Sequence, residues 1–370
     1  MKYRVIGLAR VFLNAIYTCM KKTTKTKTKI VYLSRQSNVT SLDMQLLSDE
    51  IAIQNPEMIQ VFRLRKMEPG LLHLIKYAWE ILVDMHHLAG AVIAVCDTYS
   101  IPVSFLKHKE TLVIVQIWHA MGATKKFGLQ SLGKKEGRSE EISRAMCMHK
   151  NYDYVVAPSR ATAEFYKEAF GVTDSQIAIE TLPHIDYVLD ESTKKEAFVQ
   201  QNPRVCGKKM VLYLPTFRSN EASIVKRLNN RFAGDEEWEL VTSLHPLSDV
   251  ENRQAYGYQG DFSVYDIMKF ADILITDYSA CAYEASLLKV PVYFYVPDYT
   301  DYEDNRGLNI DLKREVPDYV FEDEGLLYQA IKSGNYEYDD LIRFQEKYIE
   351  NTRNCTRRMA EFIMSARKRR

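Results

Sequence analysis

The sequence predicts an α/β protein with two doubly wound parallel-sheet domains and a cleft between them. Its 370 residues are enough for two domains with full hydrophobic cores. Short β-rich runs alternate with helical patterns along most of the chain, and this alternation is typical of parallel sheets covered by helices on both faces. Polar side chains directly follow several of the runs, as expected where ligands bind at the carboxyl ends of parallel strands.

The first domain is expected to follow a basic leader and to contain six strands. The run at 112–117 is almost wholly β-branched and apolar, as a strand buried on both faces should be. A helix is expected to begin at Ser41 or Asp43, in the manner of a capped N-terminus. The expected strands are 30–33, 58–64, 91–96, 112–117, 154–157 and 177–182, and the expected helices end near residues 54, 88 and 170.

The second domain is expected after a charged stretch at 190–208, which reads as a helix plus a linker. Its strands are predicted at 210–214, 238–243, 273–276 and 292–296, and its helices at 224–232, 263–270, after the turn at 277–279, and at 325–332. A long helical region at 339–369 is expected to pack back across the first domain. The predicted parts are a segment at 1–29, domains at 30–195 and 205–335, and a helical region at 336–370.

Both ends of the chain are basic although its net charge is zero. Residues 1–29 carry eight Lys/Arg and no acid, and the last eighteen residues carry seven against Glu361 alone. Such asymmetry points to an anionic surface, membrane or nucleic acid. Nucleic acid is the weaker partner, because the basic ends lack interleaved aromatic residues and no recognition module is seen.

The segment at 1–29 reads as an amphipathic helix lying in a membrane interface. Arg10 interrupts its apolar run, and a lysine-rich stretch stands where a signal peptide would need its cleavage site. The alternative is a helix packed on the protein's own body. No apolar run approaches the length of a transmembrane helix. The side chains expected in the interface are Val5, Ile6, Leu8, Ala9, Phe12, Leu13, Ile16 and Tyr17.

The six cysteines are scattered and include no C-x-x-C pair. This distribution argues against a zinc site or a disulfide framework, and for a reducing cytosolic setting.

The stretch at 270–295, FADILITDYSACAYEASLLKVPVYFY, reads as strand, polar turn, helix, strand. Ser279 is expected to cap the helix, and a helix N-terminus favours a phosphate group. The plainer interpretation is that Asp277 and Ser279 only cap a structural helix.

Polar side chains at three other strand ends shift that balance towards ligand binding. His119 follows the strand at 112–117 and is suited to accept a proton near neutral pH, with Lys125 and Lys126 on the next loop to attract an anion. Arg218 is suited to pair with a phosphate, and His245 to donate to a phosphate oxygen. The alternatives are that His119 is a histidine of the core, that Arg218 forms a surface salt bridge and that His245 is a loop histidine.

Two further residues are weaker candidates. Glu284 would accept from a ribose hydroxyl unless it is an ordinary helix glutamate, and Arg306 would close over a nucleotide diphosphate unless it neutralises its acidic loop. No P-loop, G-x-G-x-x-G, H-E-x-x-H or G-x-S-x-G motif appears. A nucleotide-diphosphate donor and group transfer to a hydroxyl are the natural chemistry for what remains.

Five motifs, in order and spacing, resemble the CDP-glycerol:glycerophosphotransferase family of wall teichoic acid synthesis in Gram-positive bacteria. They are VQIWHAMGATKKFG, VLYLPTFR, SLHPL, ADILITDYSACAYEASLLKVPVYFY and DYTDYEDNRG, within 112–330, and YLSRQSN adds to the likeness. The resemblance implies a GT-B-like fold and a peripheral place on the cytoplasmic face of the cell membrane. It also implies transfer of a polyol phosphate from a CDP-polyol to a hydroxyl of a lipid-linked acceptor, releasing CMP.

By the same resemblance, His119 would be the general base that deprotonates the acceptor. The residues around the CDP-polyol would be Arg218, His245, Thr276, Asp277, Ser279 and Arg306, with Glu284 facing the nucleotide. The sequence departs from the family pattern at three positions, since Ala120, Ser243 and Ala280 stand where many members have glycine, arginine and serine. The lost arginine and serine remove possible phosphate contacts, so CDP-ribitol is a plausible substitute for CDP-glycerol.

Two alternatives to this function stay open at the level of sequence. One is a GT-B glycosyltransferase that uses a UDP- or GDP-sugar. The other is a non-catalytic protein that binds a membrane or nucleic acid through its basic ends. No acidic cluster demands a metal, so none is required, although Mg²⁺ on the diphosphate is compatible with the sequence.

Overall fold

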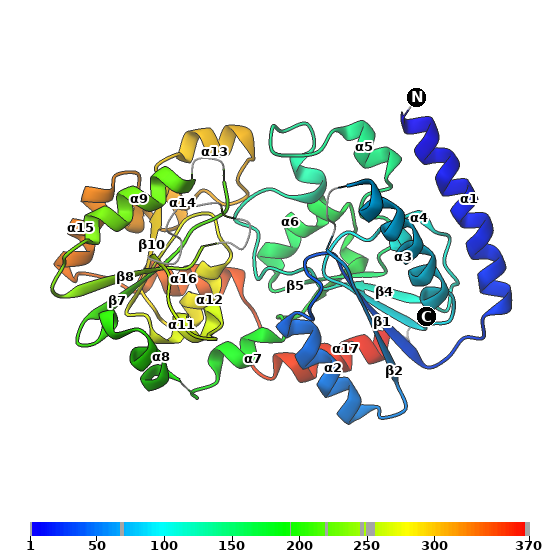
Figure 1. Cartoon of the computed structure of the whole chain (residues 1–370), viewed down its shortest axis with the longest axis horizontal. Coiled ribbons are helices and arrows are strands. Elements are labelled where there is room, and N and C mark those ends of the chain that lie inside the picture. Colours follow the sequence, from blue (N-terminus) through cyan, green and yellow to red (C-terminus); the bar gives the residue numbers. More distant parts are fainter. Residues whose placement is uncertain are drawn as a thin grey trace. The chain divides into compact units, whose positions relative to one another are not determined.

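The computed structural model describes residues 2–66, 70–192, 194–218, 221–244, 248 and 256–366. The chain forms two compact units (Figure 1). Unit 1 consists of 1–120, 126–186 and 350–370, and unit 2 consists of 121–125 and 187–349. Each unit has its own parallel sheet, which confirms the predicted class of two doubly wound α/β domains.

The six predicted strands of unit 1 form one sheet in the order β2-β1-β3-β4-β5-β6, all parallel. β1, β3 and β4 are buried along their whole length, which explains their continuous apolar runs. The chain first builds outward from β1 to β2 and then to the other side through β3, so the strand order reverses between β1 and β3. The strands are β1 Lys29–Ser34, β2 Ile59–Leu64, β3 Ile93–Cys96, β4 Val113–Gln116, β5 Tyr154–Ala157 and β6 Ile177–Ile179.

Unit 2 holds a five-stranded parallel sheet in the order β11-β10-β9-β7-β8. Its order reverses between β7 and β9, which are hydrogen-bonded neighbours. Four strands were predicted, whereas the two-residue edge strand β11 carries too short a pattern to recognise. The strands are β7 Lys209–Leu214, β8 Trp238–Thr242, β9 Ile273–Thr276, β10 Val292–Tyr295 and β11 Val320–Phe321.

Most predicted helices are present, and short ones join them. Ser41, one of the two predicted starts, caps α2 through its side chain, and Ser159 and Ser263 cap α6 and α11 in the same way. The helices of unit 1, besides α1 and α17, are α2 Leu42–Gln54, α3 Leu71–Ala89, α4 Ile101–Phe105, α5 Glu140–Ala145 and α6 Arg160–Phe170. Those further along are α7 His184–Leu189, α8 Lys195–Gln201, α9 Glu221–Phe232, α11 Val264–Phe270, α12 Cys281–Leu287, α13 Tyr299–Asn305, α14 Leu312–Glu315 and α15 Glu324–Ser333.

The region expected as one long helix at 339–369 is two helices, α16 Asp339–Tyr348 and α17 Cys355–Ala366. Asn351 and Asn354 between them have positive φ angles of 57° and 52°, a conformation that ends a helix. The division into units falls at this break, since α16 belongs to unit 2 and α17 packs on α2 in unit 1. The chain also passes from unit 1 to unit 2 inside α7, between Asp186 and Tyr187, whereas the domain boundary was predicted in the charged stretch at 190–208.

Helix α1, Lys2–Thr23, contacts α3 and α5 of unit 1, and Figure 1 shows it in dark blue at the edge of that unit. Tyr17 is 1% exposed, so the inner face packs on the body of the unit. Val5, Leu8 and Phe12 on the outer side are 59%, 70% and 65% exposed. Tyr17, predicted to lie in a membrane interface, is instead packed on the unit, as the alternative interpretation expected, while the outer face of the helix exposes apolar side chains. No described helix combines the length and apolar character needed to cross a membrane.

Candidate functional site

The polar cluster of unit 2 lies where its strand order reverses, between the carboxyl ends of β7 and β9. Thr216 and Arg218 follow β7, and Asp277 follows β9 directly. Because parallel strands bring their carboxyl ends to one edge, side chains from two distant motifs meet there, and ligands of open α/β sheets bind at this position. The structure thus brings together two of the motifs that sequence analysis had singled out.

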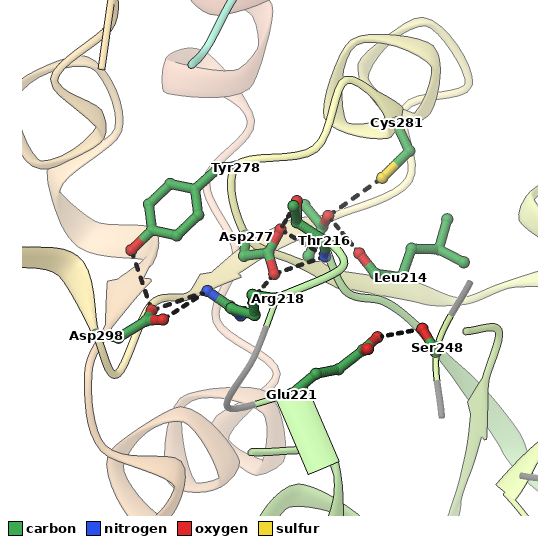
Figure 2. A network of polar contacts seen from close by, with 10 residues as sticks. Leu214, Thr216, Arg218, Glu221, Ser248, Asp277, Tyr278, Cys281 and Asp298 are labelled. Carbon is green, nitrogen blue, oxygen red and sulfur yellow. Dashed lines mark hydrogen bonds and ion pairs between the residues drawn. The ribbon is translucent and has the colours of Figure 1, made fainter. Parts of the chain in front are cut away.

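Asp277 is the centre of this cluster (Figure 2). Its side chain is fully buried. The Thr216 backbone N–H donates to both of its carboxylate oxygens at 3.0 and 2.8 Å, and the Thr216 hydroxyl donates to Oδ1 at 2.6 Å. Arg218 Nη2 donates to Oδ2 at 2.5 Å. Asp277 is therefore an internal anchor that holds the end of β7 against the end of β9.

Arg218 is held by two carboxylates. Besides Asp277 it contacts Asp298, whose two oxygens accept from Nη1 at 2.8 and 3.1 Å, and its guanidinium lies 5.5 Å from the Tyr278 ring centre. Burial lowers the pKa of Arg218, but the two carboxylates outweigh it and raise the pKa above its usual value. Nε is buried and has no hydrogen-bond acceptor in the described part of the chain. Arg218 is thus a fixed cation rather than a mobile one.

Lys125 reaches the same cluster from an unexpected part of the chain. The segment 121–125 belongs to unit 2, and the Thr124 carbonyl accepts from Asn309 N–H at 2.9 Å. Gly122 allows this packing, because a Cβ there would lie 2.1 Å from the Tyr283 ring. Burial lowers the pKa of Lys125 to about 8, with Asp277 opposing the shift and Arg306 and Arg218 adding to it.

The turn after β9 differs from the prediction in how α12 begins. The N-cap of α12 is Ala280, with no side-chain cap, and Ser279 Oγ accepts only a long 3.5 Å bond from Cys281 N–H. Thr276 is fully buried, and its hydroxyl donates to the Leu214 carbonyl at 2.8 Å. Glu284 is 5% exposed within α12. Thr276 thus joins the end of β9 to the end of β7. The prediction that Ser279 caps α12 is wrong, because Ala280 holds the N-cap position.

The remaining predicted residues are placed as follows. His245 lies outside the described residues. Arg306 ends α13 as its C-cap, and its backbone N–H donates to the Tyr302 carbonyl. Lys126 is the first residue of the second segment of unit 1, so Lys125 and Lys126, predicted as a pair, belong to different units.

His119 lies in unit 1, just after β4, with its side chain exposed. Its Nδ1 is 2.8 Å from the backbone carbonyl of Asp97, at the end of the neighbouring strand β3. A carbonyl only accepts, so Nδ1 carries the proton and Nε2 is the basic nitrogen of the neutral ring. Trp118, the residue before it, adopts a φ angle of 59° and donates its backbone N–H to Gln116 Oε1 at 2.9 Å. This geometry is that of a histidine oriented to accept a proton.

Asp97 and Asp298 were not predicted as site residues. Asp97 is 2% exposed, and burial raises its pKa to about 6 against the opposing hydrogen bonds of Ser34 and Thr98. Its position directly after β3 follows the same strand-end rule that found His119, so the signal was present. Asp298 follows β10 in the quoted loop motif, where the flanking acidic residues concealed it. Among the described residues, no three His, Cys, Asp or Glu side chains gather as a metal site.

Comparison with known proteins agrees with the family resemblance. A family model described as CDP-Glycerol:Poly(glycerophosphate) glycerophosphotransferase matches residues 15–365. A teichoic acid ribitol-phosphate primase of Bacillus spizizenii is 31% identical over 333 residues, 84% of this chain and 85% of that protein. A teichoic acid glycerol-phosphate primase of Bacillus subtilis is 27% identical, over 82% of this chain and 79% of that protein.

Among solved structures, the wall teichoic acid polymerase TagF has a TM-score of 0.72 at 18% identity, covering all of this chain and 98% of the compared chain. This likeness shows a shared GT-B-like fold.

Proposed function

This chain belongs to the CDP-glycerol:poly(glycerophosphate) glycerophosphotransferase family, and from that premise we propose the reaction it performs. It transfers a polyol phosphate, ribitol phosphate or glycerol phosphate, from a CDP-polyol to a hydroxyl of a lipid-linked acceptor in teichoic acid synthesis. The acceptor oxygen forms a bond to the β-phosphorus, the bond from that phosphorus to the bridging oxygen breaks, and CMP leaves with the bridging oxygen. The acceptor proton passes to the enzyme.

The observation that carries the proposal is the cationic cluster at the strand-order reversal of unit 2. The positive charges of Arg218 and Arg306 act on Lys125 there, and Asp277 and Asp298 hold Arg218 in place. A diphosphate supplies the opposite charge, and cations fixed before the substrate arrives stabilise developing charge on phosphoryl oxygens. Arg218 Nε, buried and without an acceptor among the described residues, is a donor for such an oxygen.

His119 is the proposed general base. The Asp97 carbonyl fixes the proton on Nδ1 and so directs the basic nitrogen, Nε2, to the acceptor hydroxyl. The cluster around Lys125 provides positive charge for the diphosphate, so the reaction as proposed does not depend on a resident metal. Mg²⁺ bound to the diphosphate of the donor is compatible with it.

The donor polyol is the finer part of the proposal. We favour ribitol phosphate, because the ribitol-phosphate primase is more similar, at 31% identity, than the glycerol-phosphate primase at 27%. Purified protein would be incubated with CDP-ribitol or CDP-glycerol and a lipid-linked acceptor, and CMP release followed. UDP- and GDP-sugars serve as controls for a glycosyltransferase. Absence of CMP with both CDP-polyols would contradict the proposal.

We also propose that the enzyme works on the cytoplasmic face of the cell membrane as a peripheral protein. The exposed apolar side chains of α1, with Lys21 and Lys22 in its last turn, suit a helix that lies in a membrane interface. All six cysteines are free thiols, as suits a reducing compartment. Leu8→Ser combined with Phe12→Ser should abolish co-flotation with vesicles, and retained co-flotation would count against α1 as the anchor.

A further inference from the structure

A pocket of about 430 Å³ opens at the amino-terminal edge of the six-stranded sheet of unit 1. The end of α1, the loop before β1, the start of β2 and the end of α3 surround it. Asp97 and His119 lie at the opposite edge of this sheet, because they follow the carboxyl ends of β3 and β4. The described residues that line the pocket include no carboxylate, and five of them are basic: Lys25, Lys27, Lys29, His86 and His87.

Lys29 shows that this pocket is more than a surface depression. Its side chain is 7% exposed, and within the described ranges no carboxylate forms an ion pair with it. Burial, and then the charge of Lys27, lower its pKa. Gly90 makes room for it, because a Cβ there would lie 3.3 Å from Lys29 Nζ and 2.9 Å from a Thr24 methyl carbon. A buried ammonium without a counter-charge is costly, and a bound anion would offset the cost.

His87 adds a neutral hydrogen-bonding group to the same wall. Burial lowers its pKa to about 4, with the positive charges of Lys29, Arg63 and His86 acting in the same direction. At neutral pH its ring is therefore uncharged and able to donate one hydrogen bond. Two exposed lysines, one buried lysine and a neutral histidine are the kind of set that binds a phosphate group.

We propose that this pocket binds the phosphate headgroup of an anionic phospholipid. The reason for choosing a lipid is the neighbouring helix, since the end of α1 lines the pocket and its outer face exposes Val5, Leu8 and Phe12. Lys109 adds positive charge beside the pocket, where its Nζ donates to the Thr24 carbonyl and the Thr26 hydroxyl. In this arrangement the apolar side chains of α1 enter the acyl region, and the cationic pocket at the end of the same helix binds at the level of the headgroups. This inference rests on the membrane association proposed above.

The test is co-flotation of the full chain with vesicles of phosphatidylcholine alone or with added phosphatidylglycerol. Lys29→Met, which removes the buried charge at similar volume, should weaken partitioning into the phosphatidylglycerol vesicles ~5-fold or more. Lys27→Gln, on an exposed residue, should weaken it in the same direction without a risk to folding. Lys150→Gln removes one exposed charge from another part of unit 1 and should change partitioning less than about twofold.

Equal losses for Lys29→Met and Lys150→Gln would show a diffuse charge effect and overturn the site. If inorganic phosphate raises the Tm of the wild-type protein but not of Lys29→Met, while both bind vesicles equally, the ligand is a soluble phosphate and the lipid assignment is wrong. CMP release by wild-type protein with a detergent-dispersed acceptor is measured separately. An inactive protein that still binds these vesicles through Lys29 would contradict the proposed reaction and leave the lipid site standing.

Discussion

Arg218 Nη2 lies 2.5 Å from Asp277 Oδ2, and both side chains are almost entirely withdrawn from water. The contact joins the loop after β7 to the end of β9, at the point where the strand order of unit 2 reverses. Arg218 therefore cannot swing towards a ligand, and its charge is set in place before any donor binds. The same contact makes the stability of unit 2 depend on two residues that the family resemblance places around the donor.

We expect Asp277→Asn to destabilise the protein by about 3 kcal/mol or more, because it leaves the buried Arg218 charge with Asp298 alone and removes a charged acceptor from Thr216. Urea denaturation measures this loss. Glu322→Gln, which breaks the exposed ion pair with Lys313, is the matched control and should have a much smaller effect. A similar loss for both variants would show that Asp277 is no internal anchor.

The lowered pKa of Lys125 predicts pH-dependent donor binding. Its pKa of about 8 means that the ammonium is lost as the pH rises through 8, so CDP affinity should fall between pH 7 and pH 9. Calorimetry at pH 8 in buffers of different ionisation enthalpy should detect proton uptake, since the diphosphate favours the charged form. Lys125→Met should bind CDP more weakly and lose this pH dependence. Lys226→Met, which changes an exposed residue of α9, should retain it. An unchanged profile in Lys125→Met would remove Lys125 from the donor site.

Removal of divalent metal should have little effect on turnover. Lys125, Arg218 and Arg306 provide the positive charge near the proposed diphosphate, so we expect activity within about twofold of the starting value after EDTA treatment. Activity is compared before and after chelation, and again after Mg²⁺ is restored. A loss of tenfold or more that Mg²⁺ reverses would show that the donor reacts as its metal complex.

The sheets and the strand-end residues were predictable because their signals are local. A buried parallel strand is a short apolar run, and the residue that follows it is at the site edge by geometry, as His119, Arg218 and Asp277 illustrate. Ser41, Ser159 and Ser263 are caps for the same local reason.

The remaining features depend on tertiary contacts. Nothing in the sequence separates Lys125 from Lys126, because the assignment of 121–125 to unit 2 comes from packing of Gly122 on Tyr283 and from the Thr124 bond to Asn309. The buried state of Asp277 likewise requires Thr216, 61 positions away in the chain. Local pattern places a polar residue at a strand end but does not say whether it faces a ligand or another side chain.

Asp97 should make the protein less stable at neutral pH than at acidic pH. Its folded-state pKa of about 6 lies above the unfolded value of about 3.9, so its contribution is present below pH 4 and is lost as the pH rises through 6. Asp97→Asn should therefore gain up to about 3 kcal/mol relative to wild type at pH 7, and about half as much at pH 5. Chemical denaturation at both pH values measures the difference. Burial also raises the pKa of Asp84 to about 6, but Asp84 is present in both proteins, so its contribution cancels in the difference between them.

His119→Ala should abolish turnover while leaving the donor site intact. Loss of a general base lowers the rate by about 10²- to 10⁴-fold, whereas Lys125, Arg218 and Asp277 all belong to unit 2 and keep their contacts. CMP release gives the rate, and the rise in Tm with CDP reports donor binding. His119→Gln retains a group that can donate to the Asp97 carbonyl but cannot take up a proton, so it should be as inactive as His119→Ala. If either variant keeps turnover within tenfold of wild type, the acceptor hydroxyl loses its proton to another group. If turnover and the CDP-induced rise in Tm disappear together, His119 acts in donor binding rather than as the base.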